Sequence, residues 1–277
     1  MTGEPRFGKR LDAVPAGDFI IPESEAAHAA PLQPVIVSLH RRPDRWAKIV
    51  AALKSVGISR ISKCRAVDGA TLSEQTLAEL VDKACGVSDQ PTSHTQLTRP
   101  AMGCFLSHLT IWKHFLAGDE EHLVVLEDDA VPSPSYSAEY AKRVLAAIPA
   151  KADLVLLGCS ILAGLAEKTE GELFSRVYYF NGTYAYLLTR KGCTTLLPHL
   201  LPLRAHIDQQ ISHASMRNPA TLADAVTPAL FDHDFSSWSD AYVPIIGSEA
   251  ADQHLGALLT SARNFLRRDG RIAPNED

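Results

Sequence analysis

The chain has 277 residues and a formal net charge of -5, and 46% of its residues are hydrophobic. This length suits one large domain, or one domain with appendages, and the slight acidity argues against a general affinity for nucleic acid. No apolar run reaches the length that a membrane-spanning helix needs.

The N-terminal stretch, residues 1–33, holds prolines, glycines and charges but no apolar core of a signal peptide, and it is predicted to be a flexible leader. Five cysteines are scattered without a Cys-x-x-Cys spacing. This pattern disfavours a zinc site or a redox pair and fits a reduced, cytoplasmic setting.

The ordered part opens with a βαβ pattern. Val35–Leu39 is a short β-branched run, which predicts a strand. Asp44 can cap a following amphipathic helix, and Gly57 can end it. Residues 60–66 are predicted to be a second strand, so the chain begins like an α/β protein.

Further elements follow from length and periodicity. Helices are predicted over 71–84, 102–116, 138–148, 192–200, 208–216 and 252–268, strands over 122–126 and 153–158, and a long surface loop over 86–100. Tyr178–Phe180 and Tyr184–Leu188 flank Asn181-Gly182, which is either a hairpin turn or part of a loop between separate strands.

Strands that alternate with helices indicate a mostly parallel central sheet. The chain has no Gly-x-Gly-x-x-Gly after its first strand and no phosphate loop ending in Gly-Lys-Ser/Thr. Dinucleotide enzymes and P-loop NTPases are therefore disfavoured.

Three acids follow the apolar run 122–126 and precede Ala130-Val131-Pro132, which indicates a buried strand that ends in a loop. Side chains alternate along a strand, so Glu127 and Asp129 are expected to point one way and Asp128 the other. Neighbouring carboxylates repel each other unless a cation lies between them, and a hard divalent ion that also binds phosphates fits this position. The alternative is a solvated acidic loop that binds nothing.

Four blocks of the sequence resemble, in the same order, the family 25 glycosyltransferases, which include bacterial lipopolysaccharide galactosyltransferases and collagen galactosyltransferases. The blocks are Val35–Arg45, Arg65–Gly69, Ala101–His108 with its Gly-Cys-x-x-Ser-His pattern, and Leu126–Val131. Weaker blocks lie at Gly182–Leu188 and around Asp208, so the resemblance covers about residues 34–240. It departs at Ala101, where the family usually has an acid.

The resemblance implies a single-domain α/β fold of the GT-A type, with a mostly parallel central sheet flanked by helices. The glycosyltransferase domain is expected over residues 34–245, with an amphipathic helix and tail over 246–277. The implied activity is metal-dependent transfer of a hexose, galactose being expected, from a UDP-sugar to a glycan acceptor, with inversion, in cell-surface polysaccharide synthesis. The expected partners are the UDP-sugar and a glycan or lipid-linked saccharide, with peripheral contact to the inner membrane face left open.

The acidic motif, the residue types and the resemblance together suggest roles for single residues. Mn²⁺ or Mg²⁺ is expected on Asp129, with Glu127 and His233 as further ligands, and Asp208 is the expected base, with His206 as the runner-up. The residues expected to bind the donor are Ser38, His40, Arg42, Arg45, Asp68, Ser107, His108, Glu127 and Asp128.

Each of these residues also has a plain structural interpretation. Asp68 can be a turn residue, Arg45 a surface helix residue, His108 a packed core histidine and Asp208 a helix cap. His233 can be an ordinary surface histidine. A domain that keeps the fold and binds nucleotide or glycan without catalysis is the alternative function. A metal-dependent phosphotransferase or nuclease is disfavoured, because its site needs further acids from other strands.

Overall fold

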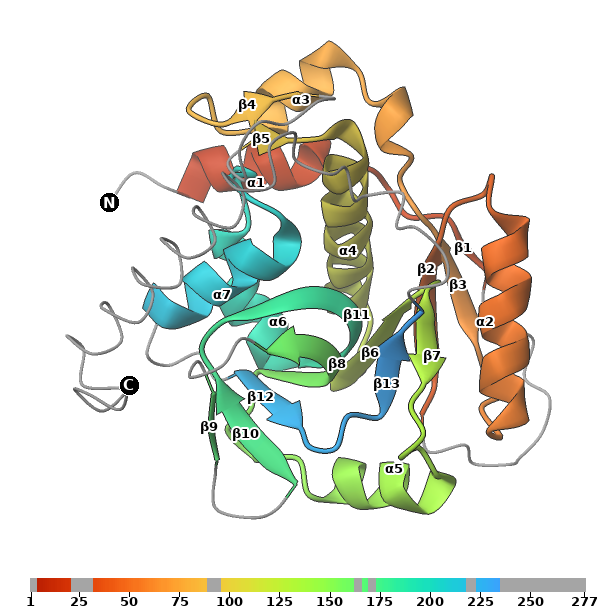
Figure 1. Cartoon of the computed structure of the whole chain (residues 1–277). Helices are drawn as coiled ribbons and strands as arrows, with labels where there is room; N and C mark the ends of the chain where they lie inside the picture. Colours follow the sequence, from red (N-terminus) through yellow and green to blue (C-terminus); the bar gives the residue numbers. More distant parts are fainter. Residues whose placement is uncertain are drawn as a thin grey trace, which may run out of the picture.

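The structure is a computed structural model that describes residues 4–20, 32–88, 96–161, 166–168, 173–217 and 223–234. A nine-stranded sheet forms its centre (Figure 1). In spatial order its strands are β1 (Phe19–Ile20), β3 (Ser62–Arg65), β2 (Pro34–Ser38), β6 (His122–Glu127), β11 (Phe180–Thr189), β8 (Leu154–Ile161), β12 (Ala223–Val226), β10 (Phe174–Val177) and β9 (Ala166–Lys168).

The sheet is mixed. The pairs β3–β2, β2–β6 and β8–β12 are parallel, and the remaining pairs are antiparallel. The predicted α/β class, with a central sheet flanked by helices, is confirmed. The βαβ pattern at the start of the sequence gives the parallel pair β2–β3. The antiparallel pairs are those of β11 with β6 and β8, of β10 with β12 and β9, and of β1 with β3, and the apolar pattern alone does not reveal strand direction.

Helices cover both faces of the sheet. They are α1 (Glu4–Ala13), α2 (Pro43–Ser55), α3 (Glu74–Leu80), α4 (Arg99–Ala117), α5 (Ala138–Ala146), α6 (Arg190–Leu196) and α7 (Ile207–Arg217), with the 3₁₀ turns η1 (Gly69–Thr71) and η2 (Leu197–His199). Two small sheets pair β13 (Phe231–His233) with β7 (Ala130–Pro132), and β4 (Gly86–Val87) with β5 (Gln96–Leu97).

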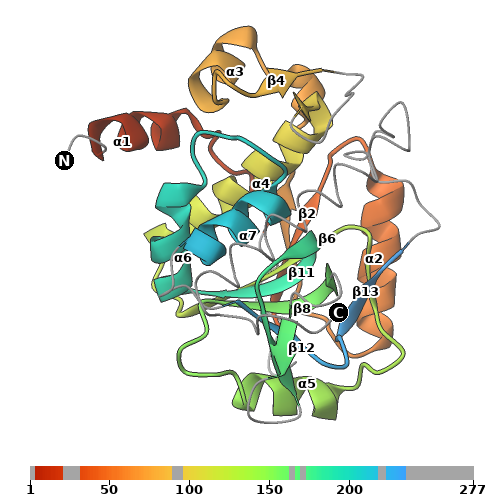
Figure 2. The ribbon, with the colours of Figure 1, turned by 60° about the vertical axis from the view of Figure 1, so that its left-hand side comes forward.

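Alternation along β6 divides the interior into two cores. Leu123 and Val125 pack in the core that includes residues of α3, α4, α6 and α7, whereas Val124 and Leu126 pack in the core of α2 and α5. Figure 2 shows α2 on one side of the sheet and α4, α6 and α7 on the other. A strand that is buried on both faces has no polar face, which explains why its sequence is an unbroken apolar run.

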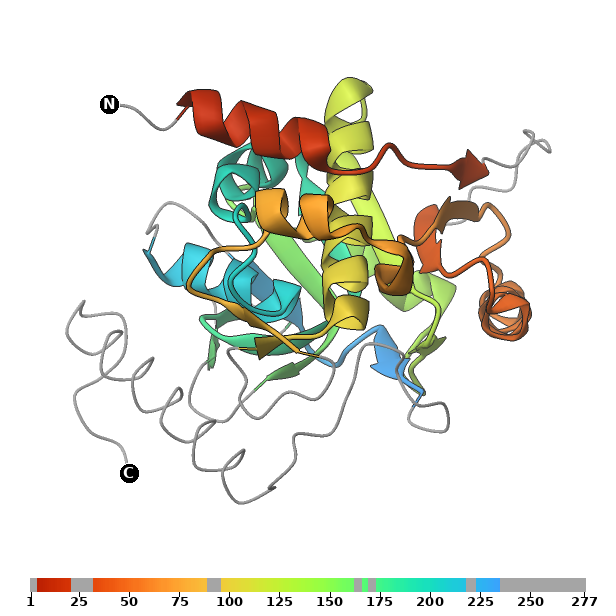
Figure 3. The same ribbon diagram turned by 90° about the horizontal axis from the view of Figure 1, so that it is seen from above.

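Residues 4–20, which the composition assigned to a leader, belong to the fold. Val14 is only 2% exposed, and β1 pairs antiparallel with β3. The Lys113 ammonium on α4 donates to the Leu11 and Val14 carbonyls, at 3.0 and 3.3 Å. Figure 3, a view from above, shows the end of α1 next to α4. The composition of residues 4–20 does not indicate an ordered segment, because their few apolar side chains pack against α4, which is distant in the sequence.

Asn181-Gly182 forms no hairpin and no loop between strands, because both residues lie within β11. The register of β11 against β8 shifts between Asn181 and Ala185, and Gly182 has a φ of +83°. The pair is therefore an irregularity in one long strand, which a glycine at positive φ permits. The predicted helix over 252–268 and part of the predicted loop over 86–100 lie outside the described residues. None of the described helices has the length and apolar character needed to cross a membrane.

Gly103 allows α4 to approach the turn that follows β3. A methyl group in place of its hydrogen would lie 2.6 Å from both the Gly69 nitrogen and the Val67 oxygen, which are backbone atoms that cannot rotate away. We expect Gly103→Ala to lower the free energy of unfolding by about 1–3 kcal/mol through this overlap, as measured by urea unfolding. Gly8→Ala in α1 is the matched control, because nothing lies within 4 Å of the added carbon. Equal stability of the two variants would contradict this account.

Candidate functional site

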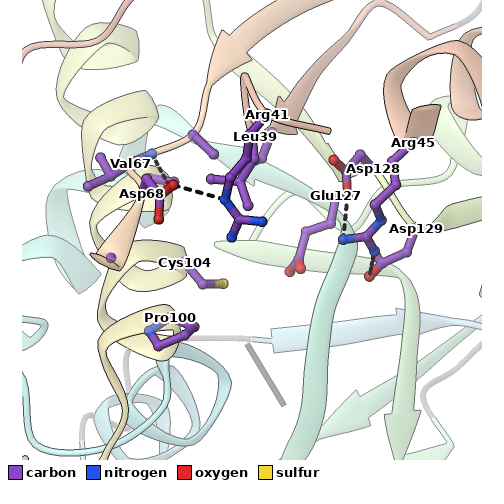
Figure 4. Close-up of a pocket in the computed structure, with 14 residues that line it drawn as sticks. Leu39, Arg41, Arg45, Val67, Asp68, Pro100, Cys104, Glu127, Asp128 and Asp129 are labelled. Atoms are coloured by element: carbon purple, nitrogen blue, oxygen red, sulfur yellow. Dashed lines mark hydrogen bonds and ion pairs between the residues drawn. The ribbon is translucent and has the colours of Figure 1, made fainter. Parts of the chain in front are cut away.

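A pocket lies where β2, β3 and β6 end, next to the first turns of α4. Because these strands are parallel neighbours, their carboxyl ends share one edge of the sheet, where α/β proteins bind ligands. Figure 4 shows the pocket with its charged side chains. It is lined by Val37, Leu39, Arg41, Arg45, Ala66, Val67, Asp68, Gly69, Pro100, Cys104, Ser107, Glu127, Asp128 and Asp129.

Arg45 holds both aspartates of the acidic turn. Its Nη1 lies 3.1 Å from Asp128 Oδ1, and its Nη2 donates to Asp129 Oδ2 at 2.5 Å. Arg45 is only 7% exposed although it lies on α2, so the interpretation of it as a surface helix residue is wrong. A planar guanidinium presents its donors to two carboxylates in a fixed fork, whereas a lysine ammonium is a compact point charge. The repulsion that the sequence predicts within this turn is therefore offset by a cation from the protein itself.

The expected alternation of the three acids is wrong at Asp129. β6 ends at Glu127, and residues 128 and 129 form a turn, so the strand's alternation stops there. Asp128 and Asp129 both turn to Arg45, while Glu127 faces α4 (Figure 4). The motif thus divides into an aspartate pair that Arg45 neutralises and a separate glutamate.

The two aspartates differ in acidity. Burial raises the pKa of Asp128 to about 6, although Arg45 and the Ser38 hydroxyl act in the opposite direction. Burial also acts to raise the pKa of Asp129, but hydrogen bonding by His233 and the charge of Arg45 together bring it below its usual value. The same contact raises the pKa of His233, whose Nε2 lies 3.4 Å from Asp129 Oδ2. Asp129 is therefore the more firmly ionised of the pair.

Glu127 has its own set of partners. Its Oε1 accepts a hydrogen bond from Thr183 Oγ1 at 2.7 Å, and His108 Nε2 lies 3.3 Å from the same oxygen. The Glu127 side chain keeps 23% of its surface exposed, whereas His108 is fully buried. In Figure 4 the carboxylate points into the pocket, between Cys104 and Asp129.

Asp68 and Ser107 shape the opposite wall. Asp68 caps η1 by accepting from the Ala70 nitrogen at 3.1 Å, and it also accepts from Arg41 Nε at 2.9 Å. Ser107 Oγ accepts from the Val67 nitrogen at 2.8 Å and donates to the Gly103 carbonyl at 2.6 Å. Asp68 is thus a turn residue that also lines the pocket. Ser107, on α4, holds the loop that follows β3 through its bond to Val67.

Several predicted residues lie away from the pocket lining. Arg42 forms a two-bond contact with Asp44, at 3.1 and 2.9 Å, and His40 is exposed. Ser38 is buried at the end of β2. Asp208 is the second residue of α7, where its Oδ2 accepts from the Gly182 nitrogen at 2.7 Å and its Oδ1 from the Gln209 nitrogen at 2.8 Å. The carboxylate therefore attaches the first turn of α7 to β11, and the interpretation of Asp208 as a helix cap is wrong.

Three residues of the site were not among those predicted from the sequence. Arg41 reaches into the pocket between Asp68 and Glu127 (Figure 4). Cys104 and Thr183 were given no role in the site. The sequence did contain a signal for each, because Arg41, Cys104 and Thr183 all lie in blocks that resemble the family. Their roles, however, depend on side chains that meet across the sheet.

The donor atoms present at the acidic turn fit a hard divalent cation. Asp129 Oδ1 is buried and has no hydrogen-bond partner among the described residues, and a hard cation is a partner that such an oxygen accepts. A second group of atoms, from Cys104, His108 and Glu127, lies within 4.8 Å of one another. Burial raises the pKa of the Cys104 thiol well above its usual value, which disfavours the thiolate that a softer metal requires.

Comparison with known proteins gives a family match. The model of the family described as "Glycosyltransferase family 25 (LPS biosynthesis protein)" matches residues 32–211. A "Glycosyltransferase 25 family member" of Drosophila pseudoobscura pseudoobscura is 28% identical over 249 residues, which are 87% of this chain and 36% of that protein. An "Inactive glycosyltransferase 25 family member 3" of Mus musculus is 42% identical over 95 residues, which are 34% of this chain and 16% of that protein.

The chain thus spans about a third of the length of the first relative and less of the second. Among solved structures, UDP-glucose pyrophosphorylase complexed with UDP-glucose aligns with 82% of this chain and 81% of its own, at a TM-score of 0.37 and 12% identity. This likeness is too weak to support a shared fold.

Proposed function

Because the chain belongs to glycosyltransferase family 25, we propose that it transfers a hexose, with galactose as the expected sugar, from a UDP-sugar to a glycan acceptor. The observation that carries the proposal is one pocket, at the carboxyl ends of parallel strands, lined by two arginines and four acids. A nucleotide-sugar donor presents the groups that such a pocket can bind, namely a diphosphate and hydroxyl groups.

The reaction requires positive charge next to the departing diphosphate. As the glycosidic bond breaks, negative charge grows on the departing diphosphate, and fixed positive charge stabilises it. Arg41 is suited to this contact, because its side chain is 52% exposed and reaches the pocket from the Asp68 side. Asp68 in turn can accept hydrogen bonds from the ribose or the base.

We further propose that Mn²⁺ or Mg²⁺ binds at Asp129, with Glu127 and His233 as additional ligands. When bound, the cation supplies positive charge to the diphosphate. The chain's own contribution is to hold Asp129 ionised. Arg45 and His233 contact one of its oxygens, while the other, Oδ1, is left without a hydrogen-bond partner among the described residues.

The proposed acceptor is a glycan or lipid-linked saccharide of cell-surface polysaccharide synthesis. We place the reaction in the cytoplasm. The family description names lipopolysaccharide biosynthesis, which supports this choice of acceptor.

Incubation with Mn²⁺, a panel of UDP-sugars and varied acceptors tests the proposal, with UDP release as the readout. We expect release with one UDP-hexose and its loss when the metal is chelated. No release with any donor and acceptor pair would count against the proposal.

An inactive nucleotide- or glycan-binding domain is the second candidate. Its support is that the mouse relative is named inactive, and that Ala101, only 3% exposed at the start of α4, stands where the family usually has an acid. Calorimetry that detects UDP binding without metal dependence, in a protein that releases no UDP, would favour this alternative.

For inversion, we propose Asp208 as the base that takes the acceptor proton. Asp208→Asn removes the basic carboxylate and keeps one of its two hydrogen bonds, because Gly182 N donates to Oδ2 and Gln209 N to Oδ1, and an amide has only one oxygen. We expect kcat to fall by about a hundredfold or more, and the free energy of unfolding to fall by about 1 kcal/mol from the lost hydrogen bond. Gln209→Ala, at the next position of α7, is the control. Full activity in Asp208→Asn would remove Asp208 from the mechanism.

A further inference from the structure

A buried line of polar side chains runs behind Glu127, away from the pocket. Trp112 Nε1 donates to the Tyr186 hydroxyl at 2.8 Å, and that hydroxyl lies 2.8 Å from His108 Nδ1. His108 Nε2 lies 3.3 Å from Glu127 Oε1, within ion-pair distance but without hydrogen-bond geometry, and it has no other hydrogen-bond partner among the described residues. None of Trp112, Tyr186 and His108 is more than 1% exposed, so all three side chains are shielded from bulk solvent.

The elements of the fold place these groups together. Trp112 and His108 are four residues apart on α4 and therefore lie on the same face of the helix. Tyr186 lies opposite Val125 of β6, and both pack in the core that includes α4. The tyrosine hydroxyl thus meets both helix residues, while Glu127 at the end of β6 meets the far side of the imidazole.

The donors and acceptors assign the protons. The indole N–H can only donate, so the Tyr186 oxygen accepts from Trp112. The tyrosine has one proton, and His108 Nδ1 is the acceptor within reach. Nδ1 must then be unprotonated, and the imidazole proton lies on Nε2, directed at Glu127. The other tautomer would leave the tyrosine proton without an acceptor and turn a nitrogen lone pair toward a carboxylate, and both cost free energy in a buried site.

From this geometry we infer that Trp112 and Tyr186 hold His108 as the Nε2–H tautomer, with that N–H next to Glu127, and that Thr183 and His108 together position the Glu127 carboxylate. The Thr183 hydrogen bond and the close approach of His108 both fall on Oε1, which leaves Oε2 as the atom offered to the ligand in the pocket. Trp112, Tyr186 and His108 are thus positioning residues, and the identity of that ligand, a UDP-sugar with or without its cation, rests on the proposed function.

Nitrogen-15 NMR of the full chain tests the tautomer directly, because protonated and unprotonated imidazole nitrogens have well separated shifts. The chain has 11 histidines, and the His108 signals are those missing from His108→Gln. We expect the neutral imidazole of wild-type His108 to carry its proton on Nε2. A proton on Nδ1 of the neutral imidazole overturns the inference whatever the activity of the protein.

Tyr186→Phe tests the positioning role. It removes the acceptor of Trp112 and the donor to His108 while keeping the ring, and we expect kcat of hexose transfer to fall by about tenfold or more, with little change in the far-UV circular dichroism. Tyr179→Phe is the matched control, since Tyr179 is 1% exposed and its hydroxyl has no hydrogen-bond partner among the described residues. An unchanged kcat in Tyr186→Phe contradicts the positioning role.

A pair of His108 variants separates positioning from packing. The amide nitrogen of glutamine reaches the Nε2 position, whereas that of asparagine reaches only the Nδ1 position. We therefore expect His108→Gln to retain more activity than His108→Asn, and equal activities would overturn the role of the Nε2 donor. If wild-type His108 carries its proton on Nε2 and yet no UDP-sugar is consumed, the proposed function fails while the tautomer assignment is upheld.

Discussion

Replacing Arg45 with methionine is expected to lower the free energy of unfolding by about 3–5 kcal/mol, because it leaves two buried carboxylates without their cation. Arg45 contacts Asp128 at 3.1 Å and Asp129 at 2.5 Å, and all three side chains are at most 8% exposed. Methionine keeps most of the apolar part of the arginine side chain, so the decrease in the free energy of unfolding comes mainly from the lost charge. Urea unfolding with comparison of m values measures it.

Arg42→Met is the control for this experiment. Arg42 lies three residues earlier and pairs with Asp44, whose side chain is 64% exposed, and such an ion pair contributes about 0–1 kcal/mol. Arg45→Lys should lie between the wild type and Arg45→Met, because one ammonium cannot match the two-pronged guanidinium. An unfolding midpoint in Arg45→Met equal to that of the wild type would show that the aspartates need no internal cation.

The effect of Arg45→Met should depend on pH. Without the arginine, the pKa of Asp128 stays raised by burial, and the pKa of Asp129 loses the lowering effect of Arg45 but keeps that of His233. A carboxylate with a raised pKa in the folded state destabilises the fold at neutral pH, and this effect is lost as pH falls through that pKa to below about 4, where both states are protonated. The stability difference between variant and wild type should therefore shrink from pH 7 to pH 5.

Replacing Asp129 with alanine is expected to lower kcat for hexose transfer by about a hundredfold to a thousandfold and to abolish Mn²⁺ binding, on the function proposed above. The Oδ1 atom of Asp129 is a buried oxygen, without a hydrogen-bond partner in the described part of the chain, that a divalent cation can use. The variant should still fold, because Arg45 keeps its contact with Asp128. UDP release and Mn²⁺ titration by calorimetry measure the two effects separately.

Asp232→Asn is the matched control. Asp232 lies beside His233 on β13, pairs with Val131 of β7 and is exposed, so it carries the same charge near the site without lining the pocket. We expect it to retain wild-type turnover and Mn²⁺ affinity. If Asp129→Ala also retains both, the acidic turn does not bind the metal, and the proposed role of the cation is wrong.

Local elements of the fold were predictable because each has a pattern of its own. The strand at Val35–Leu39, the helix that follows it and the apolar helix over 102–116 all appear, with α4 extending to Arg99–Ala117. Apolar spacing reports which face of a segment will be buried, and Gly57, with a φ of +84°, ends α2 as expected. The first strands and their helix could therefore be predicted from their own residues.

The composition of the acidic motif, the order of the four blocks and thus the family were determined by the sequence alone. The tertiary structure decided how these parts act together. It turned Asp128 and Asp129 to the buried Arg45, directed Glu127 to His108, and brought Tyr186 to α4 through antiparallel pairing of β11 with β6. The physical reason is that periodicity encodes burial within one segment, whereas charge pairs and proton positions depend on side chains that are distant in sequence and meet only when the sheet is assembled.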